Sequence, residues 1–310
     1  MTAPLPLIID CDPGVDDAVM LMMALCAPQL DVRAITTVAG NVPLRLTSRN
    51  ARMMRQIMDR PDIPVFAGCP NPILRATVTA EEFHGETGIH GVDVFEPDAP
   101  LASAHAVQYL IDTLSAASPA EYTLVVTGPM TNIAAALIQA PHITQGIKQI
   151  VAMAGADTAG GNITPFAEFN MYADPHAAAI VFNSGAPMTV LSLDVTQTVR
   201  AEPTRIDSLR AVNTPHAETM ANLLQAANTL EDRWKPGLKA PMHDPSVIAY
   251  MLAPHLFETQ QTTVSMDTTS DVRFGQTRLS RTADGPHTWV TQADADGFFA
   301  LIEHLMRDSK

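Results

Sequence analysis

The stretch that decides the fold is LPLIIDCDPGVDDAVMLMMALCA, residues 5–27. Its first part, Leu5 to Asp10, is a short apolar run without polar alternation, which predicts a β-strand buried on both faces. Its second part, Asp16 to Ala27, is rich in alanine, leucine and methionine, which predicts an α-helix. A buried strand followed at once by a helix is the repeating unit of a parallel α/β sheet.

The same alternation continues along most of the chain. Further strands are predicted over 30–39, 122–126, 149–154 and 188–193, and further helices over 44–58, from Met130 onward and from near Asp174 onward. This order predicts an α/β fold: an open, mostly parallel, doubly wound (Rossmann-like) sheet with helices on both faces.

The last third of the chain has a different pattern. Residues 203–234 are predicted to be mostly helical, with another short helix over 245–252 and a closing amphipathic helix over 298–306. Late strands are predicted over 262–266 and 288–291. Since no repeat, low-complexity segment or linker is visible, we predict a single domain, residues 1–310, with a helical insertion in its C-terminal third.

Composition excludes some classes of partner. The 310 residues carry a net charge of −14, and an acidic protein repels phosphate backbones, so nucleic acid is not an expected partner. The longest apolar run, Ala18 to Pro28, is shorter than the roughly 20 residues that a bilayer requires, so no membrane span is expected. The N-terminus has no basic region followed by an apolar one, so no signal peptide is expected.

The cysteines favour a reducing compartment. There are three of them, Cys11, Cys26 and Cys69, and no two are spaced as CxxC. Neither a disulfide framework nor a zinc knuckle is indicated. We therefore expect a cytoplasmic protein.

Polar residues stand where the predicted strands end. The acidic run begins at Asp10, Gly40-Asn41 follows the second strand, and Thr127-Gly128 follows the strand over 122–126. Ligands of open α/β sheets bind beyond the carboxyl ends of the strands, so these residues are expected to converge on one cleft.

The first of these turns holds four aspartates among residues 10–17. Carboxylates packed this closely repel one another unless a cation neutralises them, and a hard divalent ion binds carboxylate and carbonyl oxygens. Asp16 and Asp17 are also explained by the first turn of a helix, where the helix dipole favours acids. That explanation leaves out Asp10 and Asp12, so we predict a metal site.

The motifs of the chain resemble those of the inosine-uridine-preferring nucleoside hydrolase family. The resemblance follows the family's order across nearly the whole chain and is carried by segments 10–18 (DCDPGVDDA), 36–41 (TTVAGN), 84–88 (HGETG), 127–134 (TGPMTNIA), Asn162 with 165–170 (PFAEFN), 174–175 (DP), 193–196 (LDVT) and 243–245 (HDP). It implies hydrolysis of the N-glycosidic bond of ribonucleosides to ribose and free base, purine or pyrimidine.

The resemblance also implies a metal centre. Its ligands would be Asp12, Asp17, the backbone carbonyl of Thr127, and Asp244, and the ion would be calcium, one per subunit. Asp12 would in addition act as the general base toward the attacking water. The small-molecule partner would be a nucleoside, and the enzyme would assemble as a homodimer or homotetramer.

The substrate-binding residues follow from the same resemblance. Asp16 and Asn41 would hold ribose hydroxyls, and Met153 would line the sugar. His84 and His243 would face the base, with His243 as the proton donor to the leaving group. The rest of the sugar would be held by Asn162, Glu168 and Asn170.

Several of these residues also have a structural explanation. Asp244 before Pro245 fits a helix N-cap with proline at the first helical position, and taken alone it favours the cap. Asp174 has the same pattern and is predicted to be a cap. Asn132 is predicted to fix a helix start. His287, with the other histidines outside the motifs (His90, His105, His142 and His176), is predicted to lie on surfaces or loops.

The chain departs from the family pattern at residues 223–239. Relatives often place tyrosine or phenylalanine over the base there, whereas this chain has Trp234 as its only aromatic. A pocket, core or interface role for Trp234 stays open at this point, and with it the preferred base. Gln197 stands where histidine is common in the family, and we expect only a structural consequence.

Two other functions compete with nucleoside hydrolysis. A metal-dependent phosphohydrolase would also use an aspartate pair after a strand, but no glycine-rich phosphate loop and no lysine or arginine stands near the acidic turn. A catalytically silent ribose- or nucleoside-binding protein would be indicated by loss of Asp12 or Asp17, and both are present.

Overall fold

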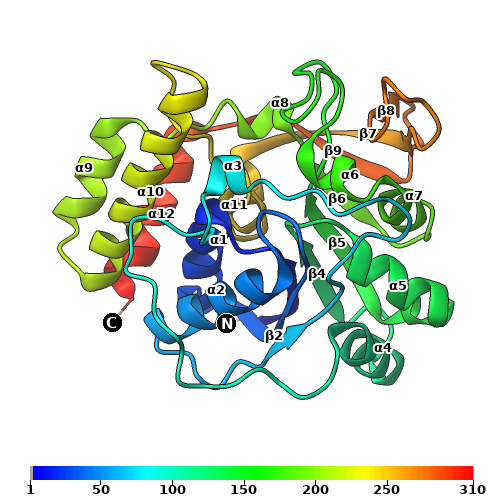
Figure 1. Ribbon diagram of the computed structural model, residues 1–310, viewed down its shortest axis with the longest axis horizontal. Coiled ribbons are helices and arrows are strands. Elements are labelled where there is room, and N and C mark those ends of the chain that lie inside the picture. Colours follow the sequence, from blue (N-terminus) through cyan, green and yellow to red (C-terminus); the bar gives the residue numbers. More distant parts are fainter. Residues whose placement is uncertain (1–2, 310) are drawn as a thin grey trace.

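The computed structural model describes residues 3–309 and contains one sheet that runs through the molecule (Figure 1). Within these residues the sheet has nine strands in the order β3-β2-β1-β4-β5-β6-β9-β7-β8. The strands are β1 (Leu5–Cys11), β2 (Leu30–Thr37), β3 (Val65–Ala67), β4 (Tyr122–Val126), β5 (Ile147–Met153), β6 (Met188–Leu191), β7 (Phe257–Met266), β8 (Thr277–Ser280) and β9 (His287–Ala293).

The predicted fold class is confirmed. Strands β1 to β6 and β9 pair in parallel, and only β7 pairs antiparallel, with β9 and β8. The chain winds outward from β1 to β3 and then returns to place β4 on the other side of β1. The order therefore reverses between β1 and β4, which is where doubly wound sheets bind their ligands.

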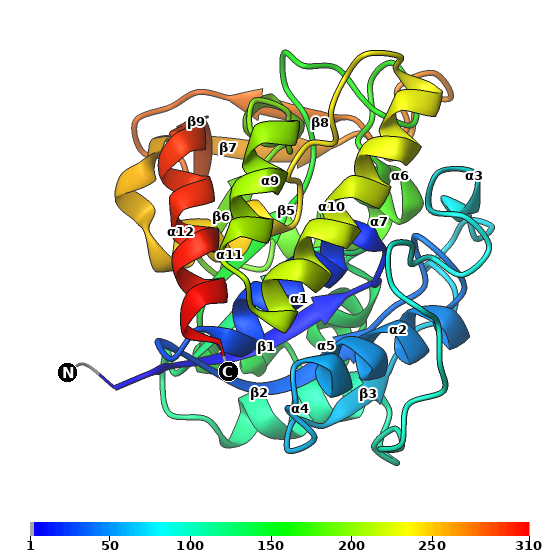
Figure 2. The same ribbon diagram turned by 90° about the vertical axis from the view of Figure 1, so that its left-hand side faces the viewer.

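Helices cover both faces of the sheet. They are α1 (Val15–Cys26), α2 (Leu44–Ile57), α3 (Glu81–His84), α4 (Ala106–Ala116), α5 (Thr131–Gln139), α6 (Phe169–Ala173), α7 (Pro175–Phe182), α8 (Leu193–Thr196), α9 (Pro203–Ala211), α10 (Pro215–Trp234), α11 (Pro245–Leu252) and α12 (Ala295–Asp308), with 3₁₀ helices at Pro141–Gly146 and Pro254–Leu256. Figure 1 shows α4, α5 and α7 on one side and α9, α10 and α12 on the other; Figure 2 shows the latter three side by side. None of the helices in residues 3–309 is long and apolar enough to cross a bilayer.

The core consists of two apolar layers separated by the sheet. Alternate side chains of β1 enter different layers: Ile9 and Cys11 pack with α1, α10, α11 and α12, while Ile8 packs with α4, α5 and α7. The predicted helical insertion is confirmed as α9 and α10, and α10 packs against α1. Because α1 has apolar contacts with the sheet and with α10, nearly all of its residues are buried.

Several predicted strands end earlier than expected. β2 ends at Thr37 and β6 at Leu191, two residues before the predicted ends. The pairing gives the reason: Thr37 pairs with the last residues of β1 and β3, and Leu191 pairs with Met153, the last residue of β5. Beyond these points the regular pairing gives way to isolated bonds, such as that from the N–H of Val38 to the carbonyl of Cys11, and the chain turns away to form the loops that surround the site.

One histidine prediction is wrong. His287 lies in β9 rather than on a surface or loop, is 3% exposed, and packs edge-on against Phe182. It is buried because β9 is inserted between β6 and β7 instead of lying at the edge of the sheet.

Asp10, the first of the four clustered aspartates, is held by structural hydrogen bonds and is not part of the group of Asp16, Asp17 and Asp244 that could hold a metal ion. Its Oδ1 accepts hydrogen bonds from Thr36 Oγ1 at 2.6 Å and from Asn132 Nδ2 at 2.8 Å. The structural role expected for Asn132 is confirmed, because its Oδ1 also accepts from the backbone N–H of Cys69 and its Nδ2 donates to the carbonyl of Thr37. Burial raises the pKa of Asp10 to about 7.

The bonds of Asn132 generate a stability prediction. Asn132→Ala leaves a buried carboxyl, a buried carbonyl and the N–H of Cys69 without these partners, and buried polar groups of this kind cost about 1–3 kcal/mol each. We expect the free energy of unfolding in urea to fall by at least about 2 kcal/mol. The control is Asn183→Ala, at an exposed position. Equal stability of the two variants would contradict the structural role of Asn132.

Candidate active site

The predicted site residues meet at the carboxyl ends of the central strands. A cavity of about 460 Å³ lies there, a size suited to a small organic ligand. Ten of the twelve predicted site residues line it: Asp16, Asn41, His84, Thr127, Met153, Asn162, Glu168, Asn170, His243 and Asp244. The other two, Asp12 and Asp17, are completely buried behind this lining.

Asp12 follows β1 directly and is held by the loop after β2. Its Oδ2 accepts a hydrogen bond from the backbone N–H of Asn41 at 2.6 Å, whereas its Oδ1 is buried without a hydrogen-bond partner in the described part of the chain. The loop approaches so closely that a Cβ at Gly40 would lie 2.0 Å from the carboxylate. Only glycine therefore fits at position 40 with this geometry.

Asp17 and Asn41 connect the first two turns of the sheet. Asp17 Oδ2 accepts from the backbone N–H of Gly14 and from Asn41 Nδ2, each at 3.0 Å, and its Oδ1 accepts from Thr127 Oγ1 at 2.9 Å. Asn41 Nδ2 also donates to the carbonyl of Asp12 at 3.1 Å. The Asp17 carboxylate, in the first turn of α1, is thereby tied to the residues that follow β2 and β4, on both sides of β1.

Asp16 and Asp244 lie close to Asp17 and extend the acidic group. One oxygen from each of Asp16, Asp17 and Asp244 lies within 4.8 Å of the others. The sequence pattern around Asp244 alone favours an N-cap, but within residues 3–309 its side chain makes no capping hydrogen bond to α11. By contrast, the cap expected at Asp174 is confirmed, because its side chain accepts from the backbone N–H of Ala177 in the following helix.

The carboxyl groups strongly perturb one another. Burial, followed by the charge of Asp17, holds the pKa of Asp12 well above its ordinary value. Burial and the charge of Asp16 raise the pKa of Asp17 to about 7. Burial and the charges of Asp16, Asp17 and Asp12 raise the pKa of Asp244 as well. The group as it stands therefore disfavours full ionisation and favours a compensating positive charge.

The donor set fits a hard divalent cation. One carboxylate oxygen each of Asp16, Asp17 and Asp244 lies within 4.8 Å of the others, the Oδ1 of Asp12 is buried without a partner in residues 3–309, and the hydroxyl of Thr127 donates to Asp17. Oxygen ligands of this kind suit calcium or magnesium, and soft nitrogen or sulfur ligands are not part of the group. The structure groups Asp16, predicted to bind ribose, with the carboxylates predicted to bind the ion.

The side of the cavity next to β5 carries the residues predicted to bind the sugar. Glu168 caps α6: its carboxylate accepts from the backbone N–H groups of Asn170, Met171 and Gly155. Burial raises its pKa to about 7 despite these hydrogen bonds. Asn170 Nδ2 donates to the carbonyls of Thr127, at 2.8 Å, and Met153, at 3.3 Å.

Asn162 reaches the same cavity from an exposed loop. Its Oδ1 accepts from the backbone N–H of Phe169 at 2.9 Å, which ties the loop to the start of α6. The loop is thus fixed at the point where Asn162 lines the cavity.

Two histidines line the cavity from different elements. His84 ends α3; it is 7% exposed and its Nδ1 is buried without a hydrogen-bond partner in residues 3–309. Burial lowers its pKa. His243 Nδ1 lies 2.6 Å from Thr196 Oγ1, and burial lowers the pKa of His243 to about 4. A Cβ at Gly14 would lie 2.7 Å from His84 Nδ1, so this glycine makes room for the imidazole.

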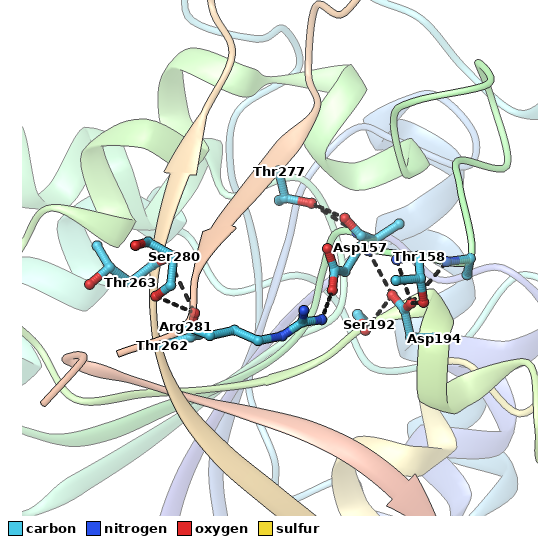
Figure 3. A network of polar contacts seen from close by, with 11 residues as sticks. Asp157, Thr158, Ser192, Asp194, Thr262, Thr263, Thr277, Ser280 and Arg281 are labelled. Carbon is cyan, nitrogen blue, oxygen red and sulfur yellow. Dashed lines mark hydrogen bonds and ion pairs between the residues drawn. The ribbon is translucent and has the colours of Figure 1, made fainter. Parts of the chain in front are cut away.

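The loop that carries Asn162 is held by Asp194, the first acidic residue of α8 (Figure 3). Asp194 Oδ2 accepts from the N–H of Asp157 at 2.7 Å, and its Oδ1 accepts from the N–H of Thr158 at 2.7 Å and of Ala159 at 2.8 Å. Although burial acts to raise it, these bonds lower the pKa of Asp194. Arg281, beyond β8, forms an ion pair with Asp157.

Sequence reasoning missed part of the cavity wall. One face of α10 contributes residues with the spacing i, i+3, i+4 and i+7, and Gln197, expected to be only structural, lines the cavity too. That spacing is visible in the sequence, but it describes a core-facing stripe equally well. The α10 residues are Ala227, Leu230, Glu231 and Trp234. The structure thus answers the open question of Trp234, which lines the cavity although it is 53% exposed.

Comparison with known proteins agrees with this geometry. Residues 7–300 match the family described as inosine-uridine preferring nucleoside hydrolase. The chain is 40% identical to the pyrimidine-specific ribonucleoside hydrolase RihA of Salmonella gallinarum over 309 residues, which cover 98% of each protein.

Solved structures give the same answer. A purine-preferring ribonucleoside hydrolase from Gardnerella vaginalis superposes with a TM-score of 0.89 at 30% identity, with 98% of each chain covered. A plant nucleoside hydrolase superposes with a TM-score of 0.91 at 28% identity, covering 98% of this chain and 99% of the other.

The chain belongs to the inosine-uridine preferring nucleoside hydrolase family. It is accordingly a ribonucleoside hydrolase, an enzyme that breaks N-glycosidic bonds.

The contacts of Asp194 generate a prediction about loop order. Asp194→Ala removes the acceptor for three backbone N–H groups, so amides 157–163 are expected to exchange with deuterium at least about tenfold faster, which corresponds to the loss of roughly 1.4 kcal/mol of local stability. Exchange measured by mass spectrometry checks this. Ser192→Ala, which removes only a 3.2 Å hydrogen bond to the same carboxylate, is the control. Unchanged exchange in 157–163 would show that Asp194 does not hold the loop.

Proposed function

We propose that this enzyme hydrolyses ribonucleosides to ribose and free base with the help of one calcium ion per subunit. The observation that carries the proposal is the group of carboxylates from Asp12, Asp17 and Asp244, buried at the floor of a cavity lined by polar side chains. No lysine or arginine forms an ion pair with any of the three in residues 3–309, so a cation from solution is their natural partner.

Asp12, Asp17, Asp244 and the carbonyl of Thr127 are proposed to hold the ion. A hard divalent cation, when bound at such a site, lowers the pKa of water and so helps to form a nucleophile at neutral pH. Asp12 is proposed to accept the proton of the attacking water. Its Oδ1 is available for this because only Oδ2 is engaged, by the N–H of Asn41.

Ribose is proposed to bind between the acidic floor of the cavity (Asp12, Asp17 and Asp244) and the side of the cavity formed by α6. Asp16 and Asn41 would hold hydroxyls on one side, and the cavity at Met153 would receive the sugar ring. Departure of the base leaves positive charge on the ribose ring, and fixed carboxylates nearby stabilise that charge without reorganising. The remaining hydroxyls would be held by Asn162, Glu168 and Asn170.

The base is proposed to leave on the side of His243 and His84. A nucleobase departs as an anion unless it receives a proton, so a hydrogen-bond donor there speeds its loss. His243 is proposed as this donor because it lines the cavity next to Asp244 and its other ring nitrogen is fixed by Thr196. His84 is the alternative donor.

Pyrimidine ribonucleosides are proposed as the preferred substrates. The support is the name of the RihA relatives, which are pyrimidine-specific and 40% identical, whereas the purine-preferring enzyme of known structure is 30% identical. Release of reducing sugar from a panel of uridine, cytidine, inosine and adenosine tests this preference directly.

The two competing functions lose their support. Family membership favours neither a phosphohydrolase nor a silent binding protein. Asp12 and Asp17, whose loss would have indicated a silent protein, are both present beneath the cavity floor.

The domain organisation, assembly and location of the enzyme are also proposed. We propose that residues 1–310 act as a single domain, that the enzyme forms a homodimer or homotetramer, and that it works in the cytoplasm. Its partners would be small-molecule nucleosides rather than nucleic acid or membrane. The three cysteines are free thiols, which is compatible with a reducing compartment.

Removal of divalent ions is expected to abolish activity. The buried carboxylates then repel one another and attack by water loses its assistance. The measurement is ribose release from uridine after treatment with a strong chelator and gel filtration, then after addition of calcium, which should restore turnover. Full activity in protein shown by elemental analysis to be free of metal would refute the role of the ion.

Asp12→Asn is expected to lower kcat by at least about 10²-fold for every nucleoside, because the same proton acceptor serves all leaving groups. Asp10→Asn is the matched control: it makes the same change two residues away at a buried aspartate outside the cavity. Turnover of the Asp12 variant near that of the control would remove Asp12 from the mechanism.

A further inference from the structure

One face of α10 forms a wall of the cavity that the proposed chemistry does not use. Three of its lining residues, Ala227, Leu230 and Trp234, present apolar surface. The fourth is Glu231, the acidic residue of this face. The residues proposed to bind the metal, to bind the sugar and to protonate the leaving group all lie outside α10. The base is therefore the part of a nucleoside that would contact the α10 wall.

Glu231 is unusual among the acidic residues of the chain. It is 4% exposed, and its Oε1 is buried without a hydrogen-bond partner in the described residues. The nearest cation is Lys235 Nζ at 3.8 Å from Oε1, beyond hydrogen-bond distance, on a side chain that is 49% exposed. Glu231 makes no other ion pair within residues 3–309.

A carboxylate oxygen that is buried without a hydrogen-bond partner lowers the stability of the fold. Such a group needs an explanation, and a ligand that completes its hydrogen bonds is one. A carboxylate is an acceptor only, so the partner must be a donor. Of the parts of a ribonucleoside, the base offers N–H groups: the N3–H of uracil and the amino group of cytosine.

We propose that Glu231 accepts a hydrogen bond from an N–H of the nucleobase and thereby selects nucleosides that carry such a donor. This rests on the proposed function, since it assigns the base end of the same cavity. A buried acceptor left unpaired by an analogue without the donor discriminates strongly against that analogue. Glu231 is thus a specificity residue, and the residues of the acidic floor perform the hydrolysis.

The test compares uridine with 3-methyluridine, in which the donor is replaced by a methyl group. The variants are Glu231→Gln, which keeps an acceptor but loses the charge, and Glu231→Leu, which keeps a similar volume but loses the acceptor. Leucine opens little new space, so relief of a clash with the methyl group does not imitate loss of the hydrogen bond. The quantity measured is kcat/KM for each substrate.

We expect Glu231→Leu to lower kcat/KM for uridine by about 10- to 100-fold, the range of a hydrogen bond to a charged group. Its kcat/KM for 3-methyluridine should change by less than about threefold. The kcat/KM of Glu231→Gln for uridine should lie between that of Glu231→Leu and that of the parent. p-Nitrophenyl riboside, which has no N–H, should also be hydrolysed within about threefold of the parent rate. The variants should unfold at no lower temperature than the parent, because the ion pair that is lost, with half-exposed Lys235 at 3.8 Å, contributes little to stability.

A control separates this hydrogen bond from a general effect of charge. Glu82→Gln makes the same change at an exposed carboxylate that also lines the cavity. It should leave the ratio of kcat/KM for uridine to kcat/KM for 3-methyluridine unchanged. Parallel losses on all substrates, together with a lower melting temperature, would show that Glu231 only holds the end of α10 beside Lys235 and would overturn the inference. Absence of ribose release from any nucleoside by the parent protein would instead refute the proposed function.

Discussion

Burial of the carboxylates of Asp12 and Asp17 is the constraint on which the surrounding structure depends. Neither forms an ion pair with a lysine or arginine in residues 3–309, so both are held by neutral donors, chiefly the backbone and side chain of Asn41. That arrangement requires the end of β2 to lie directly beside the end of β1. It also requires glycine at position 40, because a Cβ there would lie 2.0 Å from Asp12.

The parallel topology of the sheet by itself brings these residues together. In a parallel sheet the carboxyl ends of neighbouring strands lie at one edge, so the residues after β1, β2, β4 and β5 come together although they are far apart in sequence. The reversal between β1 and β4 leaves room at that edge, since the connections leave in opposite directions. Asp12 and Asp17 therefore lie just after a buried strand, and Asp244 reaches them from the start of α11.

The sequence predicted this half of the molecule because its signals are local. A buried strand is legible in residues 5–10, and four clustered aspartates indicate charge compensation. It did not separate Asp10 from Asp12, since the contacts that do so, with Thr36 and Asn132, are 26 and 122 residues away in sequence. It also could not place Glu231 or Trp234: a stripe at helical spacing faces a core or a cavity equally well, and only the packing of α10 on α1 decides.

The end of the cavity that is proposed to bind the sugar and the metal and the end formed by α10 are built from different elements. This difference affects specificity. The sugar and metal end is held by side chains that each make several hydrogen bonds, so a substitution there removes more than one bond at once, as at Asn41 or Glu168. The α10 wall is one helix face, where exchanging a side chain alters the lining without touching the sheet. Base preference is therefore free to change while hydrolysis is retained. The relatives fit this division, since a pyrimidine-specific enzyme at 40% identity and a purine-preferring one at 30% are both ribonucleoside hydrolases.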